Sequence, residues 1–191
     1  MVGWSMTERI ATIILLVEDL NQENLLRRFL RQLGHDNRQM RPVRTVPGRS
    51  SGEQFVRQSY ASEVRSIRSQ MARTRACLIA MIDADVGSTE DRLRQLERAL
   101  RDADEPQRSP TEPILNLVPK RNVETWILCL NSTPVNEADD YHHDPRVSPG
   151  SIRQAAATLY AWTRPNFTLP ATCVPSLRDC QPEFRRIPGD E

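Results

Sequence analysis

Residues 11–30 read ATIILLVEDLNQENLLRRFL, a hydrophobic run that ends in two acids and then changes to a helical pattern. The run has the length and composition of a strand buried on both faces. Glu18 and Asp19 follow it directly. After Asn21, a residue type that caps helices, apolar side chains recur at helical spacing as far as Gly34, where we expect the helix to end.

The same arrangement of apolar run and charged end recurs further along the chain. Residues 77–88 read CLIAMIDADVGS, which predicts a second buried strand that ends in Asp83 and Asp85. A third run, Ile114–Val118, leads to Lys120. The sequence therefore places ionisable residues directly after three predicted strands.

Helical patterns separate these strands and set the fold class. A fourth strand is predicted over Met40–Val46, followed by a long helix over residues 53–73. Ser88 begins a further helix, and a short one follows the last strand. Strands that alternate with helices form mostly parallel sheets. We therefore expect an α/β fold, with a sheet of about four strands flanked by helices.

The regular pattern weakens after residue 130. We expect one domain over residues 1–130 and a less regular C-terminal extension, residues 131–191, packed on it. Within the extension, helices are predicted over Ser151–Trp162 and Ser176–Glu183.

Composition excludes several classes of protein. The chain has 191 residues, of which 38% are hydrophobic and 27% charged, enough for a core and too apolar for wholesale disorder. No apolar run approaches the ~20 residues of a membrane span, and no basic segment precedes the first run as in a signal peptide. We expect a cytoplasmic protein with no membrane partner. The four cysteines lack zinc spacing and are expected to be free thiols, although Cys173 and Cys180 could pair.

Charge is distributed unevenly along the chain. The net charge is +1, yet residues 24–76 contain twelve arginines and three acids. A basic segment beside a carboxylate site suits a surface that faces phosphates, although a solvated arginine-rich helix explains it equally well. Lys120 is the sole lysine among 26 basic residues.

The acids that follow the strands predict a metal site. The carboxyl ends of parallel strands meet at one edge of a sheet, where ligands bind in such folds. Carboxylates brought together there repel one another unless a cation lies between them. Their hard oxygens suit Mg²⁺ or Mn²⁺, so we expect a divalent cation bound by Glu18, Asp83 and Asp85.

These residues resemble the Toprim domain, the metal-binding module of topoisomerases, primases and the overcoming-lysogenisation-defect nucleases. The resemblance covers roughly residues 10–130 and consists of a glutamate after the first strand and DxD after a later one. The stretch VPKRNVETWIL, residues 118–128, also looks like small stand-alone Toprim-like proteins found beside ATPases in bacterial defence loci.

The resemblance implies roles for individual residues. Glu18 would be the acid/base or metal-binding glutamate, and Asp83 and Asp85 would hold Mg²⁺. Glu23 would match the second glutamate of the nuclease subgroup, and Lys120 its lysine near the scissile phosphate. The family usually has glycine where this chain has Asp19, which could add a supporting ligand.

These roles imply a Mg²⁺- or Mn²⁺-dependent phosphodiester hydrolase, a nuclease of an antiviral defence system that works with an ATPase. We expect it to act on nucleic acid, with DNA ahead of RNA. The arginines Arg27, Arg28 and Arg31 lie on the polar face of the first helix and could contact the phosphate backbone.

Two alternatives remain open from the sequence. The first is a non-catalytic Toprim-like subunit that binds and regulates a larger partner. The second is a phospho-acceptor receiver domain, in which an acidic pair binds Mg²⁺ and a strand-end aspartate is phosphorylated. The spacing between Asp19, Asp83 and Lys120 fits a receiver poorly.

Overall fold

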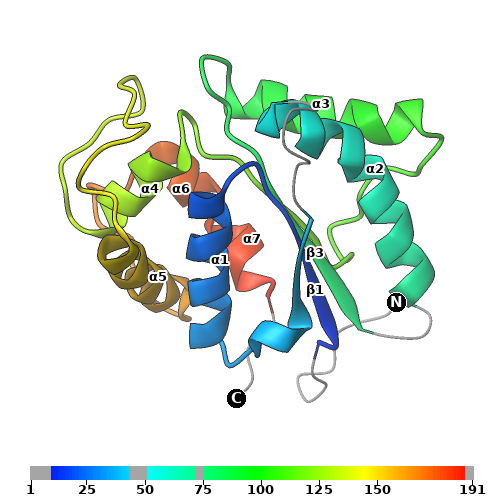
Figure 1. Ribbon diagram of the computed structural model, residues 1–191, viewed down its shortest axis with the longest axis horizontal. Coiled ribbons are helices and arrows are strands. Elements are labelled where there is room, and N and C mark those ends of the chain that lie inside the picture. The colour runs from blue at the N-terminus through cyan, green and yellow to red at the C-terminus, as the bar shows by residue number, and fades with distance from the viewer. Residues whose placement is uncertain (1–9, 44–50, 72–74, 188–191) are drawn as a thin grey trace.

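The protein is built on a four-stranded, all-parallel sheet (Figure 1). The computed structural model describes residues 10–43, 51–71 and 75–187. The strands lie in the order β2-β1-β3-β4, and their bounds are β1 Thr12–Leu16, β2 Met40–Val43, β3 Ala76–Met81 and β4 Ile114–Leu117. Leu16 is in register with both Val43 and Ala80, so the strands end at one common edge, called the carboxyl rim below. The predicted α/β class and parallel sheet are confirmed.

Each central strand is buried on both faces, as its continuous apolar sequence predicts. Ile13 and Leu15 of β1 belong to one hydrophobic core, whereas Ile14 and Leu16 belong to the core on the opposite face. All four side chains are at most 2% exposed. The alternation of side chains along a strand thus supplies both layers from a single run.

Helices cover both faces of the sheet (Figure 1). Helices α2 (Gly52–Met71) and α3 (Thr89–Asp102) contribute to the second core. The first core receives α1 (Leu20–Gln32), α4 (Val123–Leu130), α5 (Pro149–Thr163), α6 (Pro175–Asp179) and α7 (Gln181–Arg185). A 3₁₀ turn, Asn37–Gln39, precedes β2. The core on this face is therefore built jointly by residues before and after position 130.

Two predicted element boundaries were wrong. Asp19, not Asn21, caps α1, since its Oδ1 accepts a hydrogen bond from the Gln22 N–H at 2.9 Å. The single helix predicted over Ser176–Glu183 is two short helices that meet at Cys180. The end of the predicted strand Met40–Val46 lies outside the described residues.

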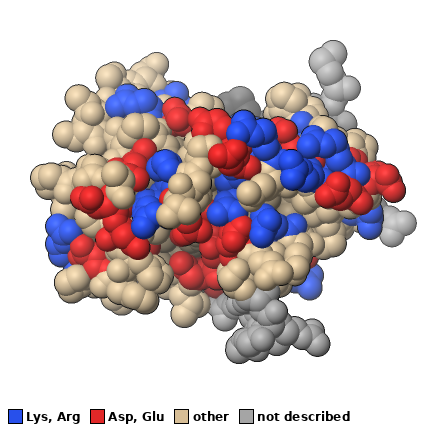
Figure 2. All heavy atoms as spheres, turned by 90° about the horizontal axis from the view of Figure 1, so that it is seen from above, with Lys and Arg blue, Asp and Glu red and all other residues tan. Residues whose placement is uncertain are grey.

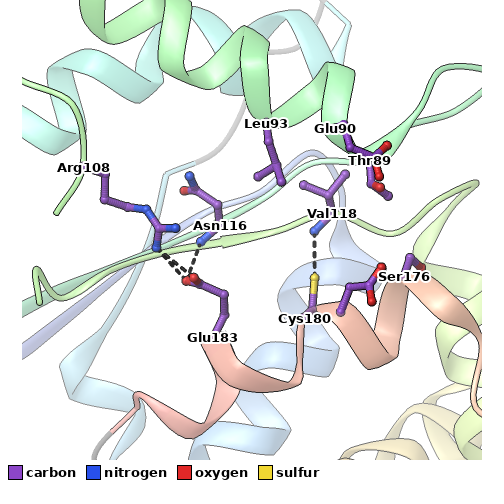
Figure 3. A pocket seen from close by; sticks show the side chains of 10 residues that line it. Thr89, Glu90, Leu93, Arg108, Asn116, Val118, Ser176, Cys180 and Glu183 are labelled. Atoms are coloured by element: carbon purple, nitrogen blue, oxygen red, sulfur yellow. Dashed lines mark hydrogen bonds and ion pairs between the residues drawn. The ribbon is translucent and has the colours of Figure 1, made fainter. Parts of the chain in front are cut away.

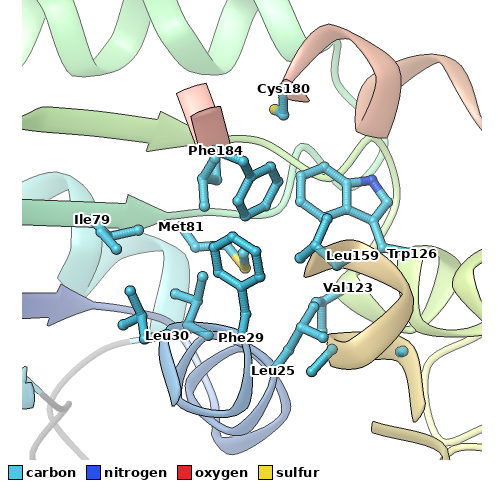
Figure 4. Close-up of a cluster of buried hydrophobic side chains, with 14 of the residues drawn as sticks. Leu25, Phe29, Leu30, Ile79, Met81, Val123, Trp126, Leu159, Cys180 and Phe184 are labelled. Atoms are coloured by element: carbon cyan, nitrogen blue, oxygen red, sulfur yellow. The ribbon is translucent and has the colours of Figure 1, made fainter. Parts of the chain in front are cut away.

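Aromatic side chains join the extension to the sheet (Figure 4). Phe184 of α7 is 1% exposed and packs edge-on against Phe29 of α1, with ring centroids 5.3 Å apart. It also meets the Trp126 ring of α4 at 6.1 Å. The Trp126 indole N–H donates to Ser176 Oγ at 2.7 Å, so this buried polar group is satisfied within the same cluster.

Side chains from the extension cover the outer edge of β4 (Figure 3). Backbone N–H groups at alternate positions, Asn116, Val118 and Lys120, donate to Glu183 Oε2, Cys180 Sγ and Ser176 Oγ, at 3.3, 3.5 and 3.2 Å. Beside this edge lies a cavity of about 240 Å³ between α3, β4 and the two last helices. The side chains take the place of a further strand.

None of the described helices is long and apolar enough to cross a membrane. The four cysteines are free and buried.

Candidate metal centre at the carboxyl rim

The carboxyl rim brings Glu18 and Asp83 into direct contact. Glu18 follows β1 and Asp83 follows β3, and these strands are neighbours in the sheet. Glu18 Oε1 accepts a hydrogen bond from the backbone N–H of Asp83 at 2.5 Å. Two residues 65 positions apart are therefore joined at the place that the sequence predicted.

Gln22 holds this pair in position and was missed in the sequence. Its side chain is fully buried. Gln22 Oε1 accepts from the Glu18 N–H at 2.9 Å, and its Nε2 donates to Asp83 Oδ1 at 3.0 Å. One amide side chain from the first turn of α1 thus links both strand ends.

Burial raises the pKa of both carboxyl groups. The pKa of Glu18 is raised to about 8, chiefly because burial disfavours the charged form. The pKa of Asp83 is raised well above its usual range by burial first and by the charge of Glu18 second. The pair is therefore costly to ionise fully unless a cation compensates the two charges.

Asp85 lies two residues after Asp83, near enough for its charge to help raise the pKa of both Glu18 and Asp83. Its backbone is in the left-handed region, with φ of 52°. Its carboxylate is 58% exposed and lies 3.5 Å from the guanidinium of Arg92, a side chain that also pairs with Glu53. Asp85 is thus compensated by a cation of the chain itself.

Two carboxylates of the predicted site fit a divalent cation. Mg²⁺ is commonly bound through one or two carboxylates, with waters and substrate phosphates as its other ligands. Glu18 and Asp83 supply such a pair, and the pKa of each is raised chiefly because burial disfavours its charged form. Within residues 10–43, 51–71 and 75–187, no three His, Cys, Asp or Glu side chains are arranged to hold a metal ion. The three-ligand set of Glu18, Asp83 and Asp85 therefore stays a prediction.

Lys120 lies at the rim, and its ammonium group donates to the carbonyl of Gly87. The backbone at this point continues the sheet, because the Ala84 N–H donates to the Pro119 carbonyl at 2.8 Å. Lys120 therefore ties the turn that contains Asp85 to the end of β4.

The other residues with predicted roles lie along α1. Glu23 is 4% exposed, and its Oε1 accepts from Arg27 Nε at 2.7 Å. Arg28 is half-buried and Arg31 is exposed. Arg27 is thus engaged within the helix, and Arg31 is the most accessible of the three arginines predicted to contact nucleic acid.

Acids from a distant loop pair with two arginines of the basic segment. Arg65 Nε lies 2.6 Å from Glu105, and Arg68 pairs with Glu105 at 3.1 Å and with Glu112 at 2.8 Å. Figure 2, seen from above the view of Figure 1, shows basic and acidic side chains interleaved. The net positive charge of the surface around these arginines is therefore lower than the count of arginines in residues 24–76 suggests.

A buried glutamate on α4 was also missed. Glu124 is 1% exposed, and its Oε1 accepts from Asn21 Nδ2 at 2.8 Å. The signal available in the sequence was an acid in the first turn of the helix that follows the last strand, which begins at the same rim.

Gly52, in the first turn of α2, packs directly on Glu18. A Cβ at position 52 would lie 2.8 Å from Glu18 Cβ and 2.9 Å from the Glu18 carbonyl oxygen, closer than such atoms approach. We expect Gly52→Ala to move the start of α2 away from the rim and to lower the free energy of unfolding by about 1–3 kcal/mol. Chemical denaturation measures this difference.

Gly150→Ala is the matched control. Gly150 is also in the first turn of a helix, but the nearest atom to an added Cβ there is Ser148 Oγ at 3.6 Å, an ordinary contact. The control should be neutral or slightly stabilising. Equal destabilisation by both substitutions would contradict the close approach at Gly52.

Comparisons with protein-family models, curated proteins and solved structures found no match for this chain.

Proposed function

We propose that this chain is a Toprim-like, Mg²⁺- or Mn²⁺-dependent phosphodiester hydrolase that acts on nucleic acid. The observation that carries the proposal is the contact between Glu18 and Asp83 at the carboxyl rim. The order of a glutamate after β1 and a DxD sequence after β3 supports the Toprim-like assignment. A partner ATPase and a role in antiviral defence stay predictions from the resemblance.

The residues around the pair divide the work of such a reaction. A bound cation would offset charge on the phosphate oxygens and lower the pKa of a water ligand. Glu18 and Asp83 would hold it, and Gln22 fixes both groups through its two hydrogen bonds. In the metal-free chain burial raises the pKa of Glu18 to about 8, and a bound cation would lower this pKa again and keep Glu18 ionised as its ligand.

Positive charge near the pair would contact the substrate. Lys120 can stabilise negative charge on a phosphate if its ammonium group donates to the phosphate instead of to the Gly87 carbonyl. Arg31 is exposed on α1 and can contact the sugar–phosphate backbone. Such contacts would bind nucleic acid without selecting a base sequence. We expect DNA ahead of RNA as the substrate.

The test is cleavage of supercoiled plasmid by the purified chain with Mn²⁺. We expect Asp83→Asn to lower the rate by roughly 100-fold or more, because several kcal/mol of transition-state stabilisation depends on the cation and each 1.4 kcal/mol is about tenfold in rate. Asp102→Asn, at an exposed position in the last turn of α3, is the control and should cleave as the wild type does. Equal cleavage by both variants would assign the activity to another site or a contaminant.

A second candidate function, binding of a larger protein partner, is favoured by two exposed apolar side chains. Leu20 follows the acidic turn and is 62% exposed, and Val86 follows Asp85 and is 87% exposed. Both residues directly follow acids of the carboxyl rim, so a partner bound at the rim would contact them. A chain that binds Mn²⁺ but leaves plasmid and single-stranded nucleic acid intact would favour this function.

A further inference from the structure

Glu124 is a buried carboxylate with one unsatisfied oxygen. It lies in the first turn of α4, two residues after the N-cap Asn122. Its Oε1 accepts from Asn21 Nδ2, whereas its Oε2 is buried and has no hydrogen-bond partner in the part of the chain that the structure describes. Among the described residues, His142 Nδ1 lies 3.9 Å from Oε1 and belongs to a side chain that is 53% exposed.

The first turn of α1 connects Glu124 with the acidic pair. Asn21 binds Glu124, and the next residue, Gln22, binds Asp83 Oδ1. Adjacent residues of α1 therefore hold Glu124 and Asp83 at the same rim.

An unsatisfied oxygen of this kind is energetically costly. A buried carboxylate oxygen without a donor loses the hydration that it has in the unfolded chain, and removal of this cost requires a donor, a proton or a cation. Asp85 carries no such cost, because it is mostly exposed and lies beside Arg92. Of the two carboxylates, Glu124 gains more from a divalent cation.

We propose that Glu124, rather than Asp85, supplies the third carboxylate to the divalent cation held by Glu18 and Asp83. This inference rests on the proposed function, since it concerns the same cation. Oε2 would bind the cation while Oε1 keeps its bond to Asn21, in the way that metal-binding carboxylates are fixed by a second hydrogen bond. Because no three His, Cys, Asp or Glu side chains among the described residues are already arranged to hold a metal ion, a bound cation would have to draw the carboxylate of Glu124 toward Asp83.

The test is the affinity of the full chain for Mn²⁺, measured by isothermal titration calorimetry without nucleic acid. We expect Glu124→Gln to raise the Kd by roughly tenfold or more, as loss of a ligand or its support does. Asp85→Asn is the matched control and should change the Kd less than about threefold, because its carboxylate would remain outside the cation's ligands.

A second variant keeps the inference testable if Glu124→Gln does not fold. Asn21→Ala leaves Glu124 in place but removes the donor to Oε1, and it should raise the Kd severalfold. Circular dichroism of each variant without Mn²⁺ establishes that it is folded before its affinity is compared. Unchanged affinity in folded Asn21→Ala and Glu124→Gln would overturn the inference.

Other outcomes separate this inference from the proposed function. Tight Mn²⁺ binding that is lost in Asp85→Asn and kept in Glu124→Gln would overturn the inference and leave the hydrolase proposal standing. A wild-type chain that binds no Mn²⁺ would overturn both. Loss of affinity in Glu124→Gln and in Glu18→Gln, with Asp85→Asn unaffected, would support both.

Discussion

Phe184→Ala is expected to lower the free energy of unfolding by about 3–5 kcal/mol, the usual cost of removing a buried phenylalanine ring. The ring is 1% exposed and fills the space between Phe29 and Trp126, which come from helices before position 130. Its loss leaves a cavity at the junction of the extension with the sheet layer. For a chain of this length the melting temperature should fall by roughly 10 °C.

Phe167→Ala is the matched control for this prediction. Phe167 also lies in the extension and stacks on Trp162, with ring centroids 6.3 Å apart, but it is 38% exposed. Differential scanning calorimetry should show a much smaller decrease in its melting temperature. Similar melting temperatures for the Phe184 variant and the wild type would contradict a core shared between the extension and the sheet.

Glu18→Gln is expected to stabilise the metal-free protein at alkaline pH. The pKa of Glu18 is raised by burial from 4.5 to about 8, so the folded chain binds a proton there that the unfolded chain has released. The contribution of Glu18 to the free energy of unfolding is therefore greatest below about pH 4.5, and it is lost as the pH rises through about 8. At about 1.4 kcal/mol per pKa unit, the rise from 4.5 to about 8 corresponds to a loss of about 5 kcal/mol in all, of which roughly 3–4 kcal/mol falls above pH 5.5.

Thermal unfolding in a chelating buffer between pH 5.5 and 8.5 measures this effect. The wild type should lose stability across the range, whereas Glu18→Gln, whose amide oxygen can still accept from the Asp83 N–H, should lose less and melt about 5–10 °C higher at pH 8.5. Glu97→Gln, at an exposed position on α3, is the control and should follow the wild type. If the melting temperatures of the wild type and Glu18→Gln changed with pH in the same way, ionisation of Glu18 would not destabilise the folded chain, and the prediction would be wrong.

The sequence predicted the sheet because its strands are continuous apolar runs bounded by charge. It was less informative about where a helix begins when two nearby residues can both act as its cap. Asp19 and Asn21 are both common helix caps, and only the path of the chain out of β1 decides between them. Pro182 lies in the first turn of α7, where its missing N–H is harmless, and this explains why two helices replace the one predicted.

Topology could place the acids at the rim, but it could not give the direction of their side chains. Glu18 and Asp83 meet because β1 and β3 are neighbours, an order that the strand pattern alone does not give. The attachment of Asp85 to Arg92 depends on how α3 packs and on a left-handed turn. Gln22 and Glu124 carry no motif, so their roles emerge only from the three-dimensional arrangement.

The uneven charge was informative only in part. Arg65 and Arg68 of α2 belong to the basic segment, but they meet acids that come about forty residues later. Sequence distance conceals such pairing, because ion pairs form between elements that pack together. An estimate of the basic surface therefore requires the fold.

Glu183, Cys180 and Ser176 cover the edge of β4, so loss of the C-terminal region would expose that edge. An open strand flank is a template on which another polypeptide can add itself and begin ordered self-association. In this protein that flank is sealed by the last two helices, so a product that ends at residue 130 would expose it. The C-terminal region thus protects the molecule from polymerisation as well as completing its interior.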